Sequence, residues 1–154
     1  MSSASDTPKV PTHEDLIRAY DGQSIDWFLQ DLVQLVNTSK GLELGITLNI
    51  GGSLVSGILI GGQRYFADFV KLFPGEAKGE WAQLLRTEIE GHSAIYEQKD
   101  AEIPQYPPNF VHLREASLFS PSGSIPTVGG VLWRGKINAV SGFSLGVLAK
   151  AEGE

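Results

Sequence analysis

The fold is organised around the sequence LELGITLNIGGSLVSGILI, which occupies residues 42–60. Apolar residues stand at every second position from Leu42 to Ile50, and this period of two predicts a strand with one face on a core. Gly51 and Gly52 then supply a two-residue turn of the primed type, which needs positive φ. We therefore expect the chain to return over residues 53–60 as the second strand of a β-hairpin.

Helical patterns precede the hairpin. Apolar residues recur at three- and four-residue intervals over residues 25–39 and predict an amphipathic helix. Ser24 is its expected N-cap, and Asp26 lies at the positive end of its dipole. Further upstream, Thr12 and Asp15 have the spacing of a capping box, which predicts a short first helix.

Two more helices are expected after the hairpin, over residues 64–73 and 79–97. The second carries a stripe of apolar and aromatic residues: Trp81, Leu84, Leu85, Ile89, His92 and Tyr96. The glycine pair 61–62 before these helices lies where a phosphate-binding loop would be found. Because it lacks both the Gly-Lys-Ser/Thr ending and the Gly-x-Gly-x-x-Gly spacing, we interpret it as a strand-to-helix corner.

The C-terminal half predicts strands. Residues 110–119 form the third strand, with Val111, Leu113 and Leu118 pointing inward and a register shift at a bulge near Ala116. The Gly-, Pro- and Ser-rich residues 120–130 predict a loop.

Residues 131–148 then alternate around the turn-prone segment 138–142 and predict the last two strands. The order α-α-β-β-α-α-β-β-β indicates an α+β fold with a five-stranded antiparallel sheet and flanking helices. A partly open small barrel is a geometry that this pattern leaves open.

Length and composition indicate one domain over residues 12–150, preceded by a flexible tail over residues 1–11. The 154 residues include no cysteine, so disulfides and thiol nucleophiles are excluded and a reducing cytoplasm fits. No run approaches the ~20 apolar residues of a membrane span, so we expect no membrane insertion. The net charge is −6, with no cluster of bases, and nucleic-acid binding is therefore not expected.

The motifs of enzymes and metal sites are missing from the sequence. None of the three histidines stands beside a second ligand at metal spacing. Ser120 and Ser122 could be drawn with His112 and Glu115 as a hydrolase triad, but they lie among Gly and Pro residues without a nucleophile elbow. We predict no catalytic residues, no metal and no cofactor.

The most suggestive polar cluster lies on the penultimate strand. Alternation places Trp133 on one face of this strand and Arg134 and Lys136 on the other. One interpretation is structural, with the tryptophan in the core and the bases solvated or paired with acidic helices. The other is an interface, because bases beside aromatic surface are common there. The interface candidates are Arg114, Arg134, Lys136 and Phe143.

Three blocks of sequence point to a family. They are residues 42–66, Phe110-Val111-His112-Leu113, and residues 132–146 with the motif Leu-Trp-Arg-Gly-Lys-Ile. In these blocks and in their spacing, over roughly residues 26–148, the chain resembles the U-type accessory protein of gas vesicle gene clusters, GvpU. The resemblance implies a non-enzymatic cytoplasmic protein that acts on vesicle assembly or on how vesicles associate. The implied partner is the vesicle shell or another accessory protein.

Two alternatives stay open. A small-molecule-binding domain would hold its ligand between sheet and helices, and it would need a deep apolar pocket with convergent polar groups. Homodimer formation through an uncovered sheet edge is also open. An RNA-binding ring of Sm-like barrels is disfavoured by the acidic balance and by the two helices after the second strand.

Overall fold

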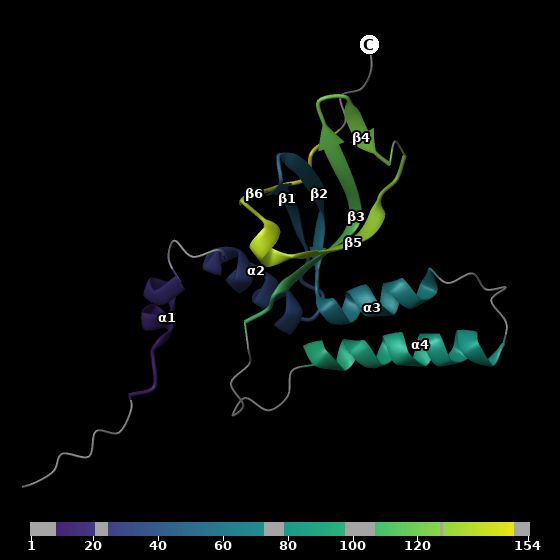
Figure 1. Ribbon diagram of the computed structural model, residues 1–154, viewed down its shortest axis with the longest axis horizontal. Helices are drawn as coiled ribbons and strands as arrows, with labels where there is room; N and C mark the ends of the chain where they lie inside the picture. The colour runs from purple at the N-terminus through teal and green to yellow at the C-terminus, as the bar shows by residue number, and fades with distance from the viewer. Residues whose placement is uncertain (1–8, 21–24, 73–78, 98–106, 127, 150–154) are drawn as a thin grey trace, which may run out of the picture.

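The computed structural model describes residues 9–20, 25–72, 79–97, 107–126 and 128–149, and within them the chain is α+β, as predicted (Figure 1). The helices are α1 (His13–Tyr20), α2 (Trp27–Thr38), α3 (Gly62–Lys71) and α4 (Glu80–His92), with 3₁₀ turns η1 (Ser93–Tyr96) and η2 (Ile137–Ala139). The strands are β1 (Leu44–Ile50), β2 (Ser53–Ile60), β3 (Phe110–Ser120), β4 (Gly123–Ile125), β5 (Val131–Lys136) and β6 (Gly142–Leu145).

The strands form one antiparallel sheet in the order β4-β3-β2-β1-β6, and β5 pairs with β3 beside β4. The β1–β2 hairpin closes at Gly51 and Gly52, whose φ angles of 58° and 83° are both positive. The predicted primed turn is therefore confirmed. A sixth strand, β4, lies inside the segment predicted as a loop over residues 120–130, so that prediction is wrong. Three residues that fold back on the end of β3 leave no periodic signal.

The sheet is strongly curled and remains open. Strands β5 and β6 lie at opposite edges, yet only residues 137–141 join them, so the two edges must approach each other. The connection is anchored at both ends: the Ile137 N–H donates to the Asn109 carbonyl and the Ser141 N–H to the Asn49 carbonyl, each at 2.9 Å. No pairing joins β5 to β6 among the described residues. The result is a partly open barrel.

Helix α2 covers the core face of the curled sheet. Its N-cap is Asp26, whose Oδ1 accepts the N–H groups of Phe28 at 2.9 Å and Leu29 at 3.3 Å. The helix therefore begins at Trp27, two residues later than predicted, and Ser24 lies outside the described residues. The side chains that fill the space between α2 and the sheet are Leu29, Val33, Val36, Ile46, Leu48, Val55, Leu59, Val111, Leu113, Ala116, Ile137 and Val140.

The opposite face of the sheet is covered in two places. Helix α3 and η1 pack over one end of β3 and β5, and α4 lies outside α3 as the outermost layer (Figure 1). Elsewhere the C-terminal segment crosses β1 and β2. Thr47 donates its hydroxyl hydrogen to the Gly146 carbonyl (2.8 Å), and the Leu148 N–H donates to the Ser56 hydroxyl (2.7 Å). These bonds satisfy two polar side chains that the segment buries.

The predicted bulge in β3 is confirmed. Pairing with β5 shifts register between Leu113 and Ala116, and Glu115 within the bulge has a φ of 51°. Val111 and Leu113 point inward as expected, but Leu118 is 38% exposed and its inward assignment is wrong. The extra residue of the bulge reverses the side-chain alternation, so a pattern read through it assigns the wrong face.

The predicted strand-to-helix corner is also present. Gly61 is the N-cap of α3, and the Gly62 N–H donates to Oδ1 of Asn37 at the end of α2 (2.9 Å). Near the N-terminus, the predicted capping box of α1 is confirmed: the Asp15 N–H donates to the Thr12 hydroxyl and the Thr12 N–H to the Asp15 carboxylate.

Candidate functional site

The four interface candidates do not share one face of the sheet. Arg134 and Lys136 on β5 lie opposite His112 and Phe110 of β3, and Arg114 follows on the same face of β3. Phe143 on β6 lies opposite Leu48, which belongs to the core. The structure therefore gathers the three bases on the face toward α3 and places the phenylalanine on the face toward α2.

Arg114 is engaged within the chain. Its guanidinium contacts the Glu43 carboxylate, with Nη2 2.6 Å from Oε2, and its Nη1 lies 2.8 Å from Oε2 of Glu115. Arg64 of α3 also reaches Glu43, at 3.3 Å. The hydrogen bond from Arg114 lowers the pKa of Glu43 below its usual value. Arg114 thus belongs to an ion-pair network that ties α3 to the sheet.

Arg134 lies in an aromatic cluster at the junction of the sheet with α3 and η1. Its guanidinium carbon is 3.8 Å from the centre of the Phe110 ring and 5.6 Å from that of Phe66. Its Nη1 donates to the Tyr96 hydroxyl (3.1 Å) and to Nε2 of His112. Because the cation stacks on two rings and bonds two side chains, it joins η1 to β3 and β5.

His112 is the buried centre of this cluster. Its ring centre lies 4.5 Å from that of Tyr65 and 5.4 Å from that of Tyr96. Burial, reinforced by the charge of Arg134, lowers the pKa of His112 to about 3. A guanidinium can only donate, so Nε2 accepts and the ring proton resides on Nδ1. This Nδ1 has no hydrogen-bond partner among the described residues, and the imidazole is neutral near pH 7.

The two serines of the hydrolase triad considered from the sequence are far from His112. Ser120 ends β3 and Ser122 lies in the turn to β4, and their hydroxyl groups are 3.0 Å apart. Ser120 is eight positions after His112 along β3, which corresponds to about 26 Å of extended chain. The described residues also contain no group of three or more His, Cys, Asp or Glu side chains placed to hold a metal ion.

Lys136 and Phe143 differ in how far their side chains are exposed to solvent. Phe143 is half-buried beside the core, and its ring centre lies 5.7 Å from that of Phe28. Lys136 is exposed at the end of β5 and forms no ion pair with the described residues. Of the four candidates, Lys136 is the one whose charge faces solvent without a carboxylate partner in the described structure.

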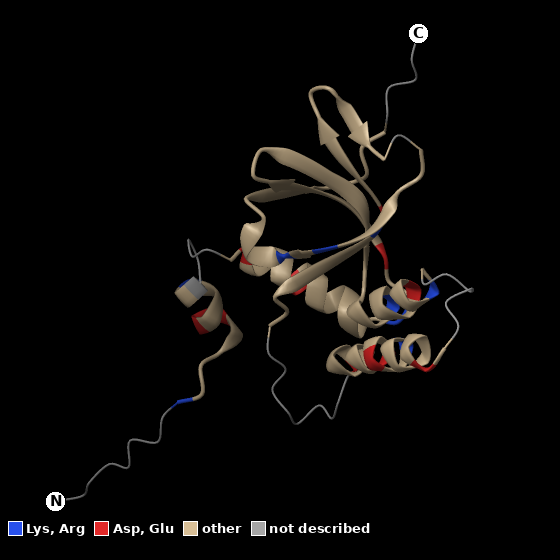
Figure 2. Ribbon diagram, turned by 45° about the vertical axis from the view of Figure 1, so that its right-hand side comes forward, with Lys and Arg blue, Asp and Glu red and all other residues tan. Residues whose placement is uncertain are grey.

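One end of the sheet is free of charged residues (Figure 2). Residues 44–63, 116–133 and 137–149 contain no Asp, Glu, Lys or Arg. Several large apolar side chains are exposed on these segments: Leu118, Ile125, Val128, Val131 and Leu145. The sequence analysis did not predict this surface because β4, which forms part of it, was not predicted. The long uncharged runs are nevertheless visible in the sequence.

Comparison with known proteins identifies the family. A family model described as Gas vesicle protein GvpU-like matches residues 26–148, from the N-cap of α2 to the segment after β6. No curated protein and no solved structure matches the chain. No helix among the described residues has the length and apolar character to cross a membrane. The match spans the whole sheet and the helices on both of its faces, and the chain belongs to the GvpU-like family of gas vesicle proteins.

Proposed function

We propose that the protein is a non-enzymatic accessory factor of gas vesicles, acting in the cytoplasm through protein–protein contacts on vesicle assembly or on vesicle association. The observation that carries the proposal is the family match over residues 26–148. The non-enzymatic part of the proposal is supported by two polar side chains that are engaged within the fold. His112 is buried and neutral, and Arg114 is held by carboxylates.

The proposed partner is the vesicle shell or another accessory protein, met around the edge strand β5. Lys136 supplies the exposed charge, and Arg114 and Arg134 lie on the same face. Phe143 would take part from the other edge strand, β6, near the point where the curled sheet brings the two edges together. Uncovered edges also leave room for a homodimer.

A flotation assay tests direct contact with vesicles. Purified protein is mixed with intact gas vesicles, the vesicles rise, and the buoyant layer is assayed. Recovery that falls with added salt supports an electrostatic interface around the bases. Recovery that resists salt points to the uncharged end of the sheet. Protein left in the lower phase directs the search to the other accessory proteins.

The contribution of Lys136 is tested with a matched pair of charge reversals. Lys136→Glu should reduce recovery in the buoyant layer without changing the melting temperature, because the side chain is exposed. Lys40→Glu makes the same change in net charge at an exposed position after α2 and should behave as the wild type. Equal recovery for the two variants would remove Lys136 from the interface.

A small-molecule site between sheet and helices gains no specific support. The junction of the sheet with α3 and η1 is occupied by the rings of Tyr65, Phe66 and Tyr96 around His112, and the space beneath α2 by buried aliphatic side chains.

A further inference from the structure

Helix α4 carries an apolar stripe that faces solvent. The helix packs on α3 and η1, and the residue it buries there is Ala82. Trp81 and Leu84 lie on another side of the helix and are 65% and 72% exposed, and the adjoining Leu85 is 39% exposed. The predicted apolar stripe of this helix is therefore present, and its N-terminal part lies on the solvent side. Three large apolar side chains within two turns form a continuous surface rather than scattered exposure.

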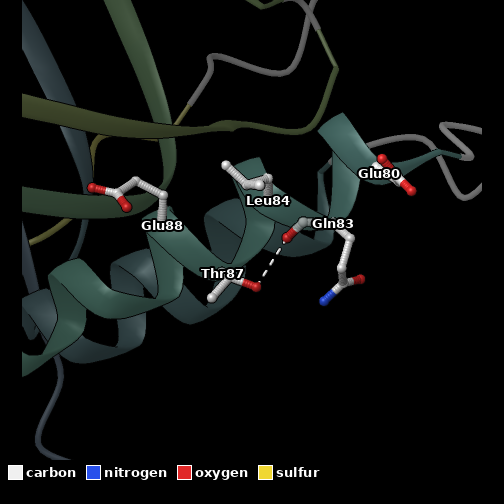
Figure 3. Close-up of a pocket in the computed structure, with 5 residues that line it drawn as sticks. All are labelled: Glu80, Gln83, Leu84, Thr87 and Glu88. Carbon is white, nitrogen blue, oxygen red and sulfur yellow. Dashed lines mark hydrogen bonds between the residues drawn. The ribbon is translucent and has the colours of Figure 1, made fainter.

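A hollow of about 430 Å³ borders this stripe (Figure 3). The described residues that line it are all on α4: Glu80, Gln83, Leu84, Thr87 and Glu88. Figure 3 shows Leu84 and Glu88 projecting from the same side of the helix. The Thr87 hydroxyl donates to the Gln83 carbonyl (2.9 Å), so it is engaged with its own helix. The hollow thus has an apolar wall with a carboxylate toward each end.

The charges beside the stripe are acidic. Glu80 and Glu88 line the hollow, and Glu90 and Glu97 are exposed farther along. The sequence of α4 holds one Lys or Arg, Arg86, which is less exposed than these carboxylates. Two copies of α4 packed antiparallel would therefore bring carboxylates together, and the same charges repel an anionic lipid surface. The electrostatics favour a basic partner.

We propose that the stripe on α4 is a docking surface for a basic amphipathic helix of another gas vesicle protein. The apolar face of that helix packs on Trp81 and Leu84, and its Lys or Arg side chains lie against Glu80 and Glu88. A third helix beside the α3–α4 pair repeats the packing that the two helices already use. This proposal deepens the proposed function. It takes from that function the source of the partner, a gas vesicle protein, whereas the chemistry of the α4 surface is argued independently.

The surface chemistry is tested with two labelled peptides of about 18 residues, long enough to span α4 as a helix. One carries Leu and Lys in amphipathic order, and the other carries Glu in place of Lys. Fluorescence anisotropy with the full chain should detect salt-sensitive binding of the Lys peptide and binding of the Glu peptide at least about tenfold weaker. Equal affinity for the two peptides would overturn the proposal.

Variants assign this binding to α4. Trp81→Ala with Leu84→Ala should weaken binding of the Lys peptide at least about tenfold, as expected for central anchors. Glu80→Gln with Glu88→Gln should weaken it severalfold and reduce its salt dependence. Leu35→Ala, on the exposed side of α2, is the control and should change nothing. Unchanged binding in both double variants would overturn the proposal, and circular dichroism checks that each variant is folded.

Flotation separates this proposal from the proposed function. One outcome is that the wild type and the double variant, Trp81→Ala with Leu84→Ala, are recovered equally in the buoyant layer. Vesicle contact then uses another face, so the α4 proposal fails while the proposed function stands. If the wild type does not float but binds the Lys peptide through α4, the surface stands and direct vesicle contact fails. Sedimentation equilibrium supplies a further check, because a dimer that dissociates in the double variant would identify a second copy as the occupant and refute a basic partner.

Discussion

Substitution of Gly62 by alanine tests the packing of η1 on α3. A Cβ at this position would lie 2.4 Å from Cγ of the Tyr96 ring, far inside van der Waals contact. Tyr96 also accepts a hydrogen bond from Arg134 and packs against His112, so the ring cannot move without loosening the aromatic cluster. Gly91 in α4 is the matched control, because a Cβ there meets nothing within 4 Å.

The magnitude follows from two opposing effects. Overpacking at a filled site costs about 1–3 kcal/mol, and loss of the bond between Tyr96 and Arg134 accounts for about 1 kcal/mol if the ring swings out. Alanine is a better helix former than glycine by up to about 1 kcal/mol, but this gain is small at Gly62, the first residue of α3. We expect Gly62→Ala to lower the free energy of unfolding by about 1–3 kcal/mol. Gly91→Ala should raise it by several tenths.

Urea denaturation at pH 7 measures both variants, and a double-mutant cycle isolates the cause. In a Tyr96→Ala background the ring is absent, so Gly62→Ala should cost less than about 0.5 kcal/mol or become stabilising. An equal cost of Gly62→Ala with and without the ring would refute the assignment of the clash to Tyr96. Stabilisation by both glycine substitutions would refute the close approach itself.

Two further predictions concern pH. Glu43, whose pKa is lowered by Arg114, stabilises the fold above the unfolded value near 4.5, and this contribution is lost as the pH falls through the folded pKa. Urea denaturation should therefore show that Glu43→Gln costs about 1 kcal/mol at pH 7 and progressively less as the pH falls below 4.5. His112, with its pKa lowered to about 3, stays neutral while the unfolded chain takes up a proton below pH 6.5. Stability should thus decline as the pH falls from 6.5 to 5, approaching a slope of about 1.4 kcal/mol per unit from this group, and His112→Gln should remove that component. An unchanged slope in that variant would contradict the burial of a neutral imidazole.

Local patterns were sufficient for the elements whose signal is contained in a few adjacent residues. The period of two with Gly51-Gly52 predicted the hairpin, because a primed turn needs positive φ at both positions and glycine adopts it freely. The capping box at Thr12 and the bulge near Ala116 were predicted for the same reason. The family resemblance rested on the hairpin, on residues 110–113 and on residues 132–146, and it agrees with the family match over residues 26–148.

The interface candidates show where local patterns stop. Alternation placed Arg134 and Lys136 on one face of their strand, and the register with β3 agrees. Whether a base on that face is free depends on what packs above it. Arg134 lies under η1 and is held by Tyr96 and His112, whereas Lys136, two residues later, lies beyond the aromatic cluster and faces solvent.

Helix α4 gives the same lesson for helices. Its periodicity indicated that Trp81, Leu84 and Leu85 share one stripe, but the small Ala82 faces the neighbouring helix and the stripe residues face solvent. Periodicity along a chain determines which residues share a side, since that depends only on backbone geometry. Which side is buried is decided by contacts between segments far apart in sequence. For this protein, the hairpin, the caps and the bulge followed from the order of residues, while the curl of the sheet, the engagement of Arg114 and Arg134 and the exposed stripe of α4 came from tertiary packing.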